Sequence, residues 1–394
     1  MLDPSTLTQQ RPPQGLFSRL PLGLTWIAAA TRIRFCLRTG VLALLMVFLS
    51  GFLVGPAWAA DRVSRLPAGN AITDGKALLR YALPIDNPSV RELQTSLEDI
   101  ANQVRAKRLS AATKDVSKAS GILQNRQTDL LSSVSEDQKA KATDLITAIQ
   151  TQLGTLQTAI DAKDKAQIRE QRTQLLDQVG ELEELMVQKF PFEVPAEYSS
   201  LPQLKGRATI ALTTNKGPLT LVVDGYSAPV TAGNFVDLVQ RGFYNGLKFI
   251  RAEESYVLQA GDPPGPEEGF IDPVMKKYRG IPLEVLVQGD ETPTYGITLE
   301  DAGRYRDQPV LPFSAFGAIA MARPGDDPNG GSSQFFFFLF EPELTPAGLN
   351  LLDGRYSVFG YVTEGQEVLE KLREGDVIES AQVVKGADNL QVPA

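Results

Sequence analysis

The sequence contains no histidine, one cysteine and two tryptophans among its 394 residues. The cysteine and both tryptophans, Cys36, Trp26 and Trp58, lie within the first 59 residues. The rest of the chain therefore has no thiol nucleophile, no disulfide, no serine–histidine triad and no zinc site built from the usual ligands. Any catalysis there must work without thiol or imidazole chemistry.

The N-terminus has the layout of an export signal. Three arginines precede an uncharged apolar stretch, residues 41–55, and small residues follow it. We predict a signal peptide over residues 1–59, cleaved between Ala59 and Ala60. The alternative is an uncleaved membrane anchor, because the uncharged stretch is marginally long enough to span a bilayer. Contact with a membrane is expected only through this uncleaved signal.

The charge balance is acidic. The whole chain has a formal net charge of −8, and loss of a signal with five arginines and one aspartate leaves the mature chain near −12. A nucleic-acid partner needs a basic surface that can displace counterions from phosphates. The charge therefore argues against nucleic acid, and it permits basic protein partners without identifying any.

The first half of the mature chain has the spacing of amphipathic helices. After an N-terminal segment, residues 60–86, four helical patterns follow in residues 87–190. Helix-start signals stand at Asn87-Pro88, Ser110, Ser135 and Asp164. Short connections favour antiparallel neighbours, so we predict a four-helix bundle, with a long coiled coil as the alternative. We interpret Glu183 and Glu184 as part of a solvated face, and expect interaction or steric control rather than catalysis.

The second half has a different periodicity. Residues 191–206 contain three prolines and adjacent serines, and we interpret them as a linker. From residue 207 onward short β-rich runs begin, the first two forming a predicted hairpin with its turn at Asn215-Lys216-Gly217. Many short strands with few helices favour a closed barrel or a sandwich. The predicted fold is thus multidomain, α plus β.

Seven short motifs of this half occur in the order found in cyclophilins. They are Val230-Thr231-Ala232-Gly233-Asn234-Phe235, Tyr244-Asn245-Gly246, Phe249-Ile250-Arg251, Gln259-Ala260-Gly261-Asp262-Pro263, Gly317-Ala318-Ile319-Ala320-Met321-Ala322, Ser332-Ser333-Gln334-Phe335-Phe336 and Leu352-Asp353-Gly354-Arg355 to Phe359-Gly360. Residues 207–390 therefore resemble the cyclophilin-type peptidyl-prolyl cis-trans isomerases, which implies a cyclophilin-like closed β-barrel. About residues 263–316 exceed the usual length and are interpreted as an insertion, either a lid or docking surface or a solvated loop.

Isomerisation of an X-Pro bond demands few functional groups. Rotation faces a barrier of about 18–20 kcal/mol because the nitrogen shares its lone pair with the carbonyl. A catalyst needs an apolar slot for the proline ring and partners for the flanking backbone. It also needs a cation whose N–H engages the prolyl nitrogen as conjugation is lost. Neither a nucleophile nor a cofactor is required, and we expect none.

The resemblance assigns these tasks to particular residues. Arg251 would be the catalytic cation, because guanidinium stays protonated and offers five fixed donors. Gln259 and Gln334 would hold the substrate backbone. The other predicted substrate-binding residues line or border the slot, and they are Tyr256, Val257, Ala322, Arg323, Phe336, Leu351, Leu352 and Tyr356. Strand alternation sends only two of the four phenylalanines at 335–338 to one face, and the family pattern selects Phe336.

Several positions depart from the family pattern. Ile250 stands where a histidine is common, the slot lining is smaller and more polar, and Pro324 cannot donate a backbone hydrogen bond. Glu253 and Glu254 can pair with Arg251 and compete with substrate. We therefore expect weak or narrowly selective isomerase activity and poor binding of cyclosporin-type inhibitors.

The order of signal, bundle and inserted cyclophilin domain resembles the thylakoid-lumen multidomain cyclophilins of cyanobacteria and chloroplasts. This resemblance implies an exported protein of the thylakoid lumen or periplasm, with its helical domain packed against the isomerase face. Its implied partners are proline-containing client proteins, photosystem II subunits among them, and its implied role is photosystem II assembly. The alternative function is a non-catalytic cyclophilin-fold chaperone or assembly scaffold that binds clients.

Overall fold

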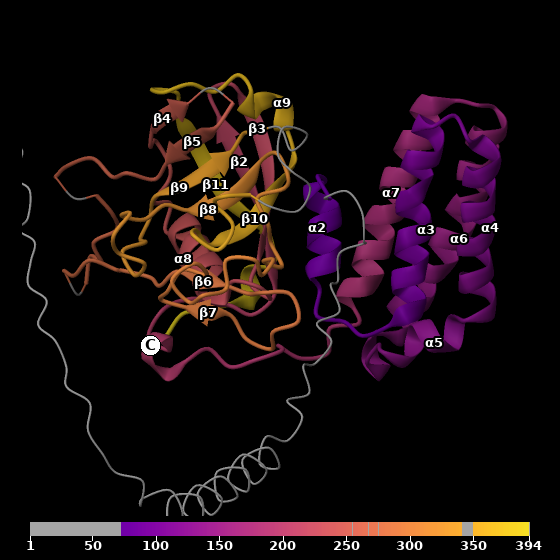
Figure 1. Ribbon diagram of the computed structural model, residues 1–394, viewed down its shortest axis with the longest axis horizontal. Coiled ribbons are helices and arrows are strands. Elements are labelled where there is room, and N and C mark those ends of the chain that lie inside the picture. Colours follow the sequence, from indigo (N-terminus) through magenta and orange to yellow (C-terminus); the bar gives the residue numbers. More distant parts are fainter. Residues whose placement is uncertain (1–71, 254, 267, 275, 341–349, 394) are drawn as a thin grey trace, which may run out of the picture. The chain divides into compact units, whose positions relative to one another are not determined.

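The computed structural model describes residues 72–253, 255–266, 268–274, 276–340 and 350–393. The predicted signal peptide and its cleavage site lie outside the described residues, as does Glu254. The described residues form a helical first half and a β-rich second half (Figure 1). Within the described ranges, no helix has the length and apolar content needed to cross a bilayer.

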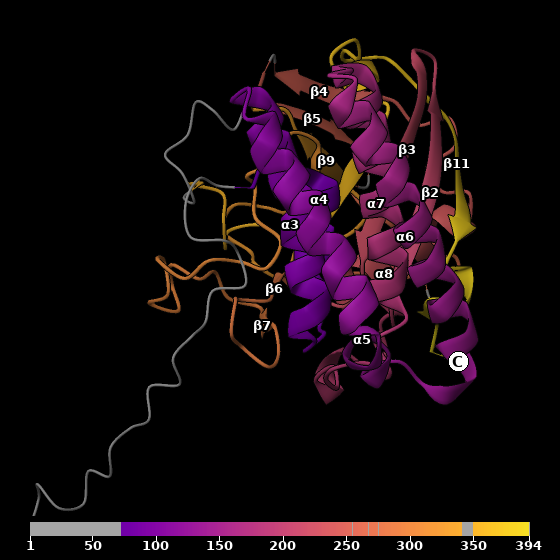
Figure 2. The ribbon, with the colours of Figure 1, turned by 90° about the vertical axis from the view of Figure 1, so that its right-hand side faces the viewer.

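The first half is helical. Its elements are α2 (Gly75–Ala82), α3 (Pro88–Arg105), α4 (Leu109–Asn125), α5 (Gln127–Ser132), α6 (Lys139–Asp161) and α7 (Lys165–Glu184). The four long helices pack as neighbours in the pairs α3–α4, α4–α6, α6–α7 and α3–α7, and lie side by side in Figure 2. Their apolar stripes meet in one core that includes Leu97, Leu123, Leu153 and Leu182. Burial of such side chains, at about 1.5–3 kcal/mol each, is what holds the helices together.

The predicted number of helices is too low. Residues 87–190 contain five α-helices rather than four, and the described part of the chain contains eight. The expected second helix breaks at Arg126, whose φ of −123° and ψ of 25° leave the helical region, and α5 continues beyond it. Leu130 of α5 is nonetheless fully buried in the bundle core, so the break preserves the apolar stripe.

The helix-start signals succeed at two positions and fail at the other two. The predicted cap at Ser110 is wrong, because α4 already begins at Leu109 and Arg108 precedes it without a side-chain capping bond. Asn87 accepts a hydrogen bond from the backbone N–H of Val90, and Asp164 accepts one from that of Ala166, so both caps are confirmed. Ser135 makes no capping hydrogen bond, because a 3₁₀ turn, η1 (Glu136–Gln138), precedes α6.

The interpretation of Glu183 as a solvated residue is wrong. Its side chain is completely buried, and Oε1 accepts a hydrogen bond from Nη1 of Arg91 on α3 at 3.1 Å. Burial raises the pKa of this carboxyl to about 7, and the nearby Arg91 opposes the shift. Glu184 is partly exposed and lies 3.4 Å from the Lys385 ammonium.

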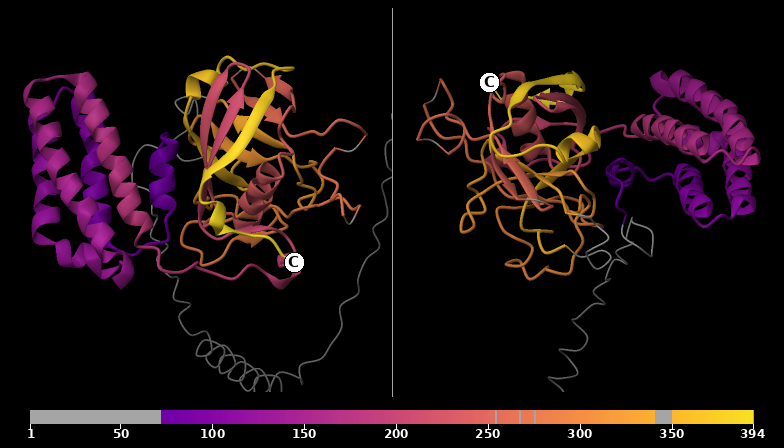
Figure 3. Two further views of the ribbon diagram at one scale, coloured as in Figure 1. Left: turned by 180° about the vertical axis from the view of Figure 1, so that it is seen from behind. Right: turned by 90° about the horizontal axis from the view of Figure 1, so that it is seen from above.

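The second half is built on an antiparallel sheet. Its elements are β1 (Gln203–Leu204), β2 (Arg207–Thr214), β3 (Gly217–Asp224), α8 (Pro229–Gln240), β4 (Phe249–Glu253), β5 (Val257–Ala260), β6 (Glu284–Val285), β7 (Thr294–Tyr295), β8 (Ala318–Met321), β9 (Phe335–Phe338), β10 (Val358–Glu364), α9 (Gln366–Leu369), β11 (Ile378–Lys385) and β12 (Leu390–Gln391). The main sheet has eight strands in the order β11-β2-β3-β10-β8-β9-β5-β4 and curves around its inner face (Figure 3). The predicted hairpin of β2 and β3 is confirmed.

The predicted closed barrel is wrong, because the sheet is an open half-barrel. Among the described residues, its edge strands β11 and β4 share no ladder. The residues around their starts are joined by one bridge, Lys248–Val377, and by backbone hydrogen bonds of Phe249 with Gly375 and Asp376. An antiparallel partner for the rest of β4 would have to come from residues 372–376, and these form an irregular segment with a turn. No strand in the part of the chain that the structure describes therefore pairs with the rest of β4 to close the ring.

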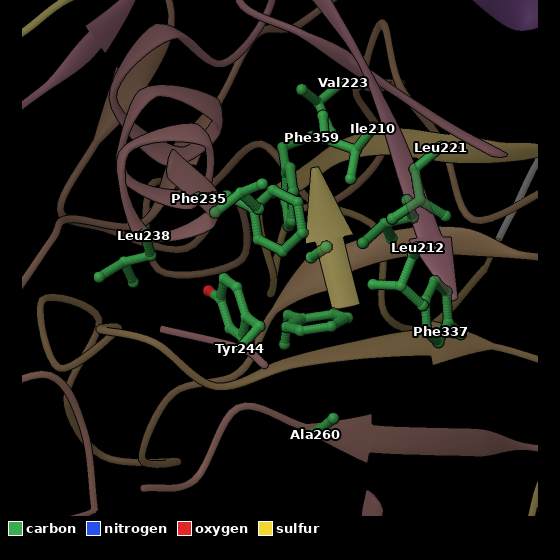
Figure 4. Packing of buried hydrophobic residues seen from close by; sticks show 14 of the residues in the cluster. Ile210, Leu212, Leu221, Val223, Phe235, Leu238, Tyr244, Ala260, Phe337 and Phe359 are labelled. Atoms are coloured by element: carbon green, nitrogen blue, oxygen red, sulfur yellow. The ribbon is translucent and has the colours of Figure 1, made fainter. Parts of the chain in front are cut away.

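The two faces of the sheet carry separate apolar clusters. The inner cluster packs Ile210, Leu212, Leu221 and Val223 against α8, with Phe235 and Tyr244 between them (Figure 4). The outer cluster contains Val257, Phe336, Phe338 and Tyr361, together with Leu78 and Leu79 of α2. Alternation along β9 is confirmed, since Phe335 and Phe337 belong to the inner cluster.

The predicted insertion is folded rather than a solvated loop. β6 and β7 pair within it, and Leu283, Val285, Val287 and Leu299 form a small core of their own. Glu284, which is buried, accepts hydrogen bonds from the backbone N–H groups of Val230 and Thr231 at 3.2 and 2.8 Å. This carboxylate thus caps the N-terminus of α8 and ties the insertion to the sheet's helix.

Candidate active site

Strand register aligns three predicted site residues on the outer face of the sheet. Arg251 on β4 lies opposite Gln259 on β5, and Gln259 lies opposite Phe336 on β9. Phe249, two residues before Arg251, packs in the inner cluster, so strict alternation would send Arg251 inward as well. The register shifts between Phe249 and Arg251, and this bulge at Ile250 turns the guanidinium to the outer face.

The Arg251 guanidinium is paired with a neighbouring carboxylate. Nε donates to Oε1 of Glu253 at 2.8 Å, and Nη2 donates to the same oxygen. Both side chains are about half exposed, at 51% and 49%. The predicted pairing of Arg251 is therefore confirmed for Glu253, while Glu254 lies outside the described residues.

The two predicted glutamines are in contact with each other. Nε2 of Gln259 donates to Oε1 of Gln334 at 2.7 Å. Nε2 of Gln334 donates in turn to Oδ1 of Asp262 at 3.0 Å and to the carbonyl oxygen of Glu268 at 2.8 Å. Burial and the charge of Glu268 raise the pKa of Asp262, and the hydrogen bond from Gln334 opposes this shift. These side chains form a connected polar strip beside Arg251.

An apolar wall lies along this strip. Phe336 is 6% exposed, its ring stacks on that of Phe313 with centroids 6.0 Å apart, and the Tyr356 ring stands perpendicular to it at 5.4 Å. Val257 belongs to the same cluster, and Leu352, Tyr356 and Ala322 pack against it from partly buried positions. The arrangement therefore offers an apolar surface beside a guanidinium and two amides.

Three predicted residues lie at the margin of this wall. Tyr256 is 37% exposed and its ring meets that of Phe338 at 6.1 Å, while Leu351 is 88% exposed and outside the cluster. Arg323 donates to the carbonyl oxygen of Arg355 at 3.0 and 2.8 Å, and its guanidinium lies over the Tyr356 ring at 5.2 Å. Arg323 thus orders the segment that carries Tyr356.

Sequence reasoning missed Asp353 and Phe313. Oδ1 of Asp353 accepts from the backbone N–H of Phe313 at 2.8 Å, and Oδ2 accepts from that of Asn350 at 3.3 Å. Burial raises the pKa of Asp353 to about 6, while these hydrogen bonds oppose the rise. The carboxylate joins the insertion to the Leu352 segment. Asp353 belongs to one of the seven cyclophilin motifs, but nothing in the neighbouring sequence indicates that its partner, Phe313, lies 40 residues away.

Comparison with protein families covers both halves of the chain. Residues 74–187 match the family described as "Peptidyl-prolyl cis-trans isomerase CYP38-like, PsbQ-like domain". Residues 209–390 match the family described as "Cyclophilin type peptidyl-prolyl cis-trans isomerase/CLD".

Individual relatives cover both halves together. A Synechocystis protein named as a thylakoid lumen peptidyl-prolyl cis-trans isomerase is 58% identical over 90% of this chain and 95% of its own. The chloroplastic isomerases CYP38 and CYP37 of Arabidopsis thaliana are 45% and 32% identical, over 84% and 85% of this chain and 78% and 74% of theirs. The chain therefore belongs to the cyclophilin-type peptidyl-prolyl cis-trans isomerases, in the group that carries an N-terminal PsbQ-like helical domain.

Proposed function

We propose that the protein catalyses cis–trans isomerisation of X-Pro bonds in exported proteins, with Arg251 as the catalytic residue. The observation that carries this proposal is the row formed by Arg251, Gln259 and Phe336 on one face of the sheet. β9 and β4 are the two neighbours of β5, and adjacent strands are about 5 Å apart. A proline ring that packs on Phe336 therefore places its nitrogen one to two strand spacings from the Arg251 guanidinium.

The chemistry follows from the amide bond. As the bond twists, the nitrogen lone pair leaves conjugation with the carbonyl and becomes a hydrogen-bond acceptor. An Arg251 N–H that donates to this lone pair stabilises the twisted state more than either planar isomer, which is what accelerates a reaction. Each ~1.4 kcal/mol of such stabilisation speeds the exchange about tenfold. Gln259 holds the flanking backbone so that the twist occurs about one bond.

Activity is weak or narrowly selective in this proposal. Glu253 already occupies two N–H groups of Arg251, so a substrate must displace a carboxylate before it gains the guanidinium. The slot wall includes Val257 and the hydroxyl-bearing Tyr356. A smaller and more polar lining binds proline less strongly than a large apolar one.

The proposed site of action is the thylakoid lumen. Support comes from the relatives named for the thylakoid lumen and the chloroplast, which match the chain across both domains. The proposed clients are lumenal proteins with exposed X-Pro bonds, and photosystem II subunits during assembly are the class that the family resemblance favours.

A binding module is the second candidate function. Two observations favour it, namely the pairing of Arg251 with Glu253 and the presence of Leu78 and Leu79 of α2 in the same cluster as Phe336. In this alternative the apolar wall holds client segments without isomerising them, and the N-terminal helices limit access to the wall.

Magnetisation-exchange NMR of an Ala-Pro peptide separates the two functions. With residues 60–394 present in catalytic amount, the enzyme function predicts faster cis–trans exchange, which falls about tenfold in Gln259→Ala. Tyr305→Ala, a change at a 66% exposed insertion residue, serves as the control and should leave the rate unchanged. Saturable peptide binding without any acceleration would reject the enzyme function in favour of the binding module.

A further inference from the structure

Both amide hydrogens of Gln334 are committed to fixed oxygen acceptors. One faces Oδ1 of Asp262 at 3.0 Å and the other faces the backbone carbonyl of Glu268 at 2.8 Å. Reversal of the amide would direct its oxygen at a carboxylate and a carbonyl, neither of which can donate a hydrogen bond. Asp262 and Glu268 therefore determine which end of the Gln334 amide faces the rest of the site.

The orientation of Gln334 determines that of Gln259. Oε1 of Gln334 accepts from Nε2 of Gln259 at 2.7 Å, so the Gln259 amide must direct its nitrogen toward Gln334. Its carbonyl oxygen and its second N–H then remain for other partners. Gln259 lies directly opposite Arg251 across β4 and β5, on the face where the proline slot lies.

The backbone next to Asp262 packs tightly against the backbone next to Gln334. Gly261 has a φ of +99°, and a Cβ at this position would lie 2.3 Å from the carbonyl oxygen of Ser333. The Ser333 hydroxyl donates to the carbonyl oxygen of Gly261 at 2.8 Å. The segment that carries Asp262 is thus pressed against the segment that carries Gln334, at a contact that only glycine permits.

We propose that Asp262 is a positioning residue for isomerisation, which acts through Gln334 to fix the amide orientation of Gln259. This inference rests on the proposed function. The insertion also contributes, because the backbone carbonyl of Glu268 accepts the second hydrogen bond from the Gln334 amide. The insertion thereby takes part in building the substrate site. In this proposal Asp262 acts on the substrate only through the two glutamines.

A double-mutant cycle on kcat/KM tests the proposal in residues 60–394. Asp262→Ala should lower kcat/KM about fivefold, the equivalent of one hydrogen bond. In a Gln259→Ala background the same change should cost less than about twofold, because the group through which it acts has gone. Asp262→Asn keeps an acceptor oxygen for Gln334 and should stay within about twofold of the natural protein. Equal losses in both backgrounds would overturn the proposal.

The side-chain amide signals of Gln259 and Gln334 give a readout that needs no enzyme activity. In ¹⁵N-correlated NMR spectra, Asp262→Ala should shift the Gln259 amide signals, whereas Glu291→Ala, at an exposed acid of the insertion, should not. Unchanged Gln259 signals in Asp262→Ala would also overturn the proposal. If the natural protein accelerates no exchange, the proposed function fails, and the NMR signals alone then decide the role of Asp262.

Discussion

Replacement of Glu253 by Gln should raise isomerase activity. Glu253 holds the Arg251 guanidinium through Nε at 2.8 Å and through Nη2, and both side chains are about half exposed, at 51% and 49%. Exposed ion pairs contribute about 0–1 kcal/mol, and the double contact with one oxygen places this pair near the upper end. In Glu253→Gln the substrate no longer has to break this ion pair. Removal of that cost, about 1 kcal/mol, corresponds to about a fivefold gain in kcat/KM.

The same competition should respond to salt. Raising the ionic strength from about 0.05 to about 1 M shortens the screening length from more than 10 Å to about 3 Å and weakens the pair. The natural protein should therefore gain activity with salt, while Glu253→Gln should gain little. Peptide exchange measured by NMR at both ionic strengths checks this, with Glu181→Gln on an exposed face of α7 as the charge-matched control. An unchanged or lower rate in Glu253→Gln, or equal salt responses, would refute the reasoning.

Three further outcomes are expected. Gly75→Ala should destabilise the packing of α2 by about 1–3 kcal/mol and increase its hydrogen exchange, because the new Cβ meets Cβ of Tyr361 at 2.7 Å; Gly154→Ala, with nothing within 4 Å, should not destabilise. The free energy of unfolding should fall as pH rises from about 4.5 through about 7, because the folded-state pKa of Glu183 is raised. Urea titrations at several pH values should show a smaller pH dependence of this free energy in Glu183→Gln. Phe313→Ala should cost about 3–5 kcal/mol in the same titrations, because a 1% exposed ring beneath Phe336 is lost, and a cost under about 1 kcal/mol would contradict this packing.

Local signals in the sequence predicted local structure well. Asn87 and Asp164 cap their helices because a capping oxygen needs only the N–H groups two or three residues ahead. The alternation of four phenylalanines on β9 follows from strand geometry alone. Ser135 has the same local signal, but the 3₁₀ turn before α6 leaves its side chain without a capping bond.

The features that the sequence did not predict depend on residues far apart in the chain. Glu183 is buried because Arg91 lies 3.1 Å away, although 92 residues separate the two in sequence. The contact of Gln334 with Asp262 joins residues 72 positions apart, so the two motifs that contain these residues do not show that they are partners. The open edge of the sheet likewise depends on how the irregular segment before β11, with Gly375 at a φ of +88°, meets a strand that lies far earlier in the sequence.

The bulge at Ile250 sets the direction of the Arg251 side chain, and the sequence did not predict it. It reverses the side-chain direction between Phe249 and Arg251, and a β-bulge has no reliable composition when glycine is absent. The resemblance to cyclophilins points to Arg251, but only the register explains why this residue lies opposite Gln259.

The rate of peptide cis–trans exchange in Arg251→Ala, compared with the natural protein at saturating peptide, tests the central claim most directly. If an Arg251 N–H stabilises the twisted amide, the variant should lose about 100-fold in kcat, or ~2.7 kcal/mol, with little change in KM. A variant that keeps the natural kcat, or loses only affinity for the peptide, would contradict the account.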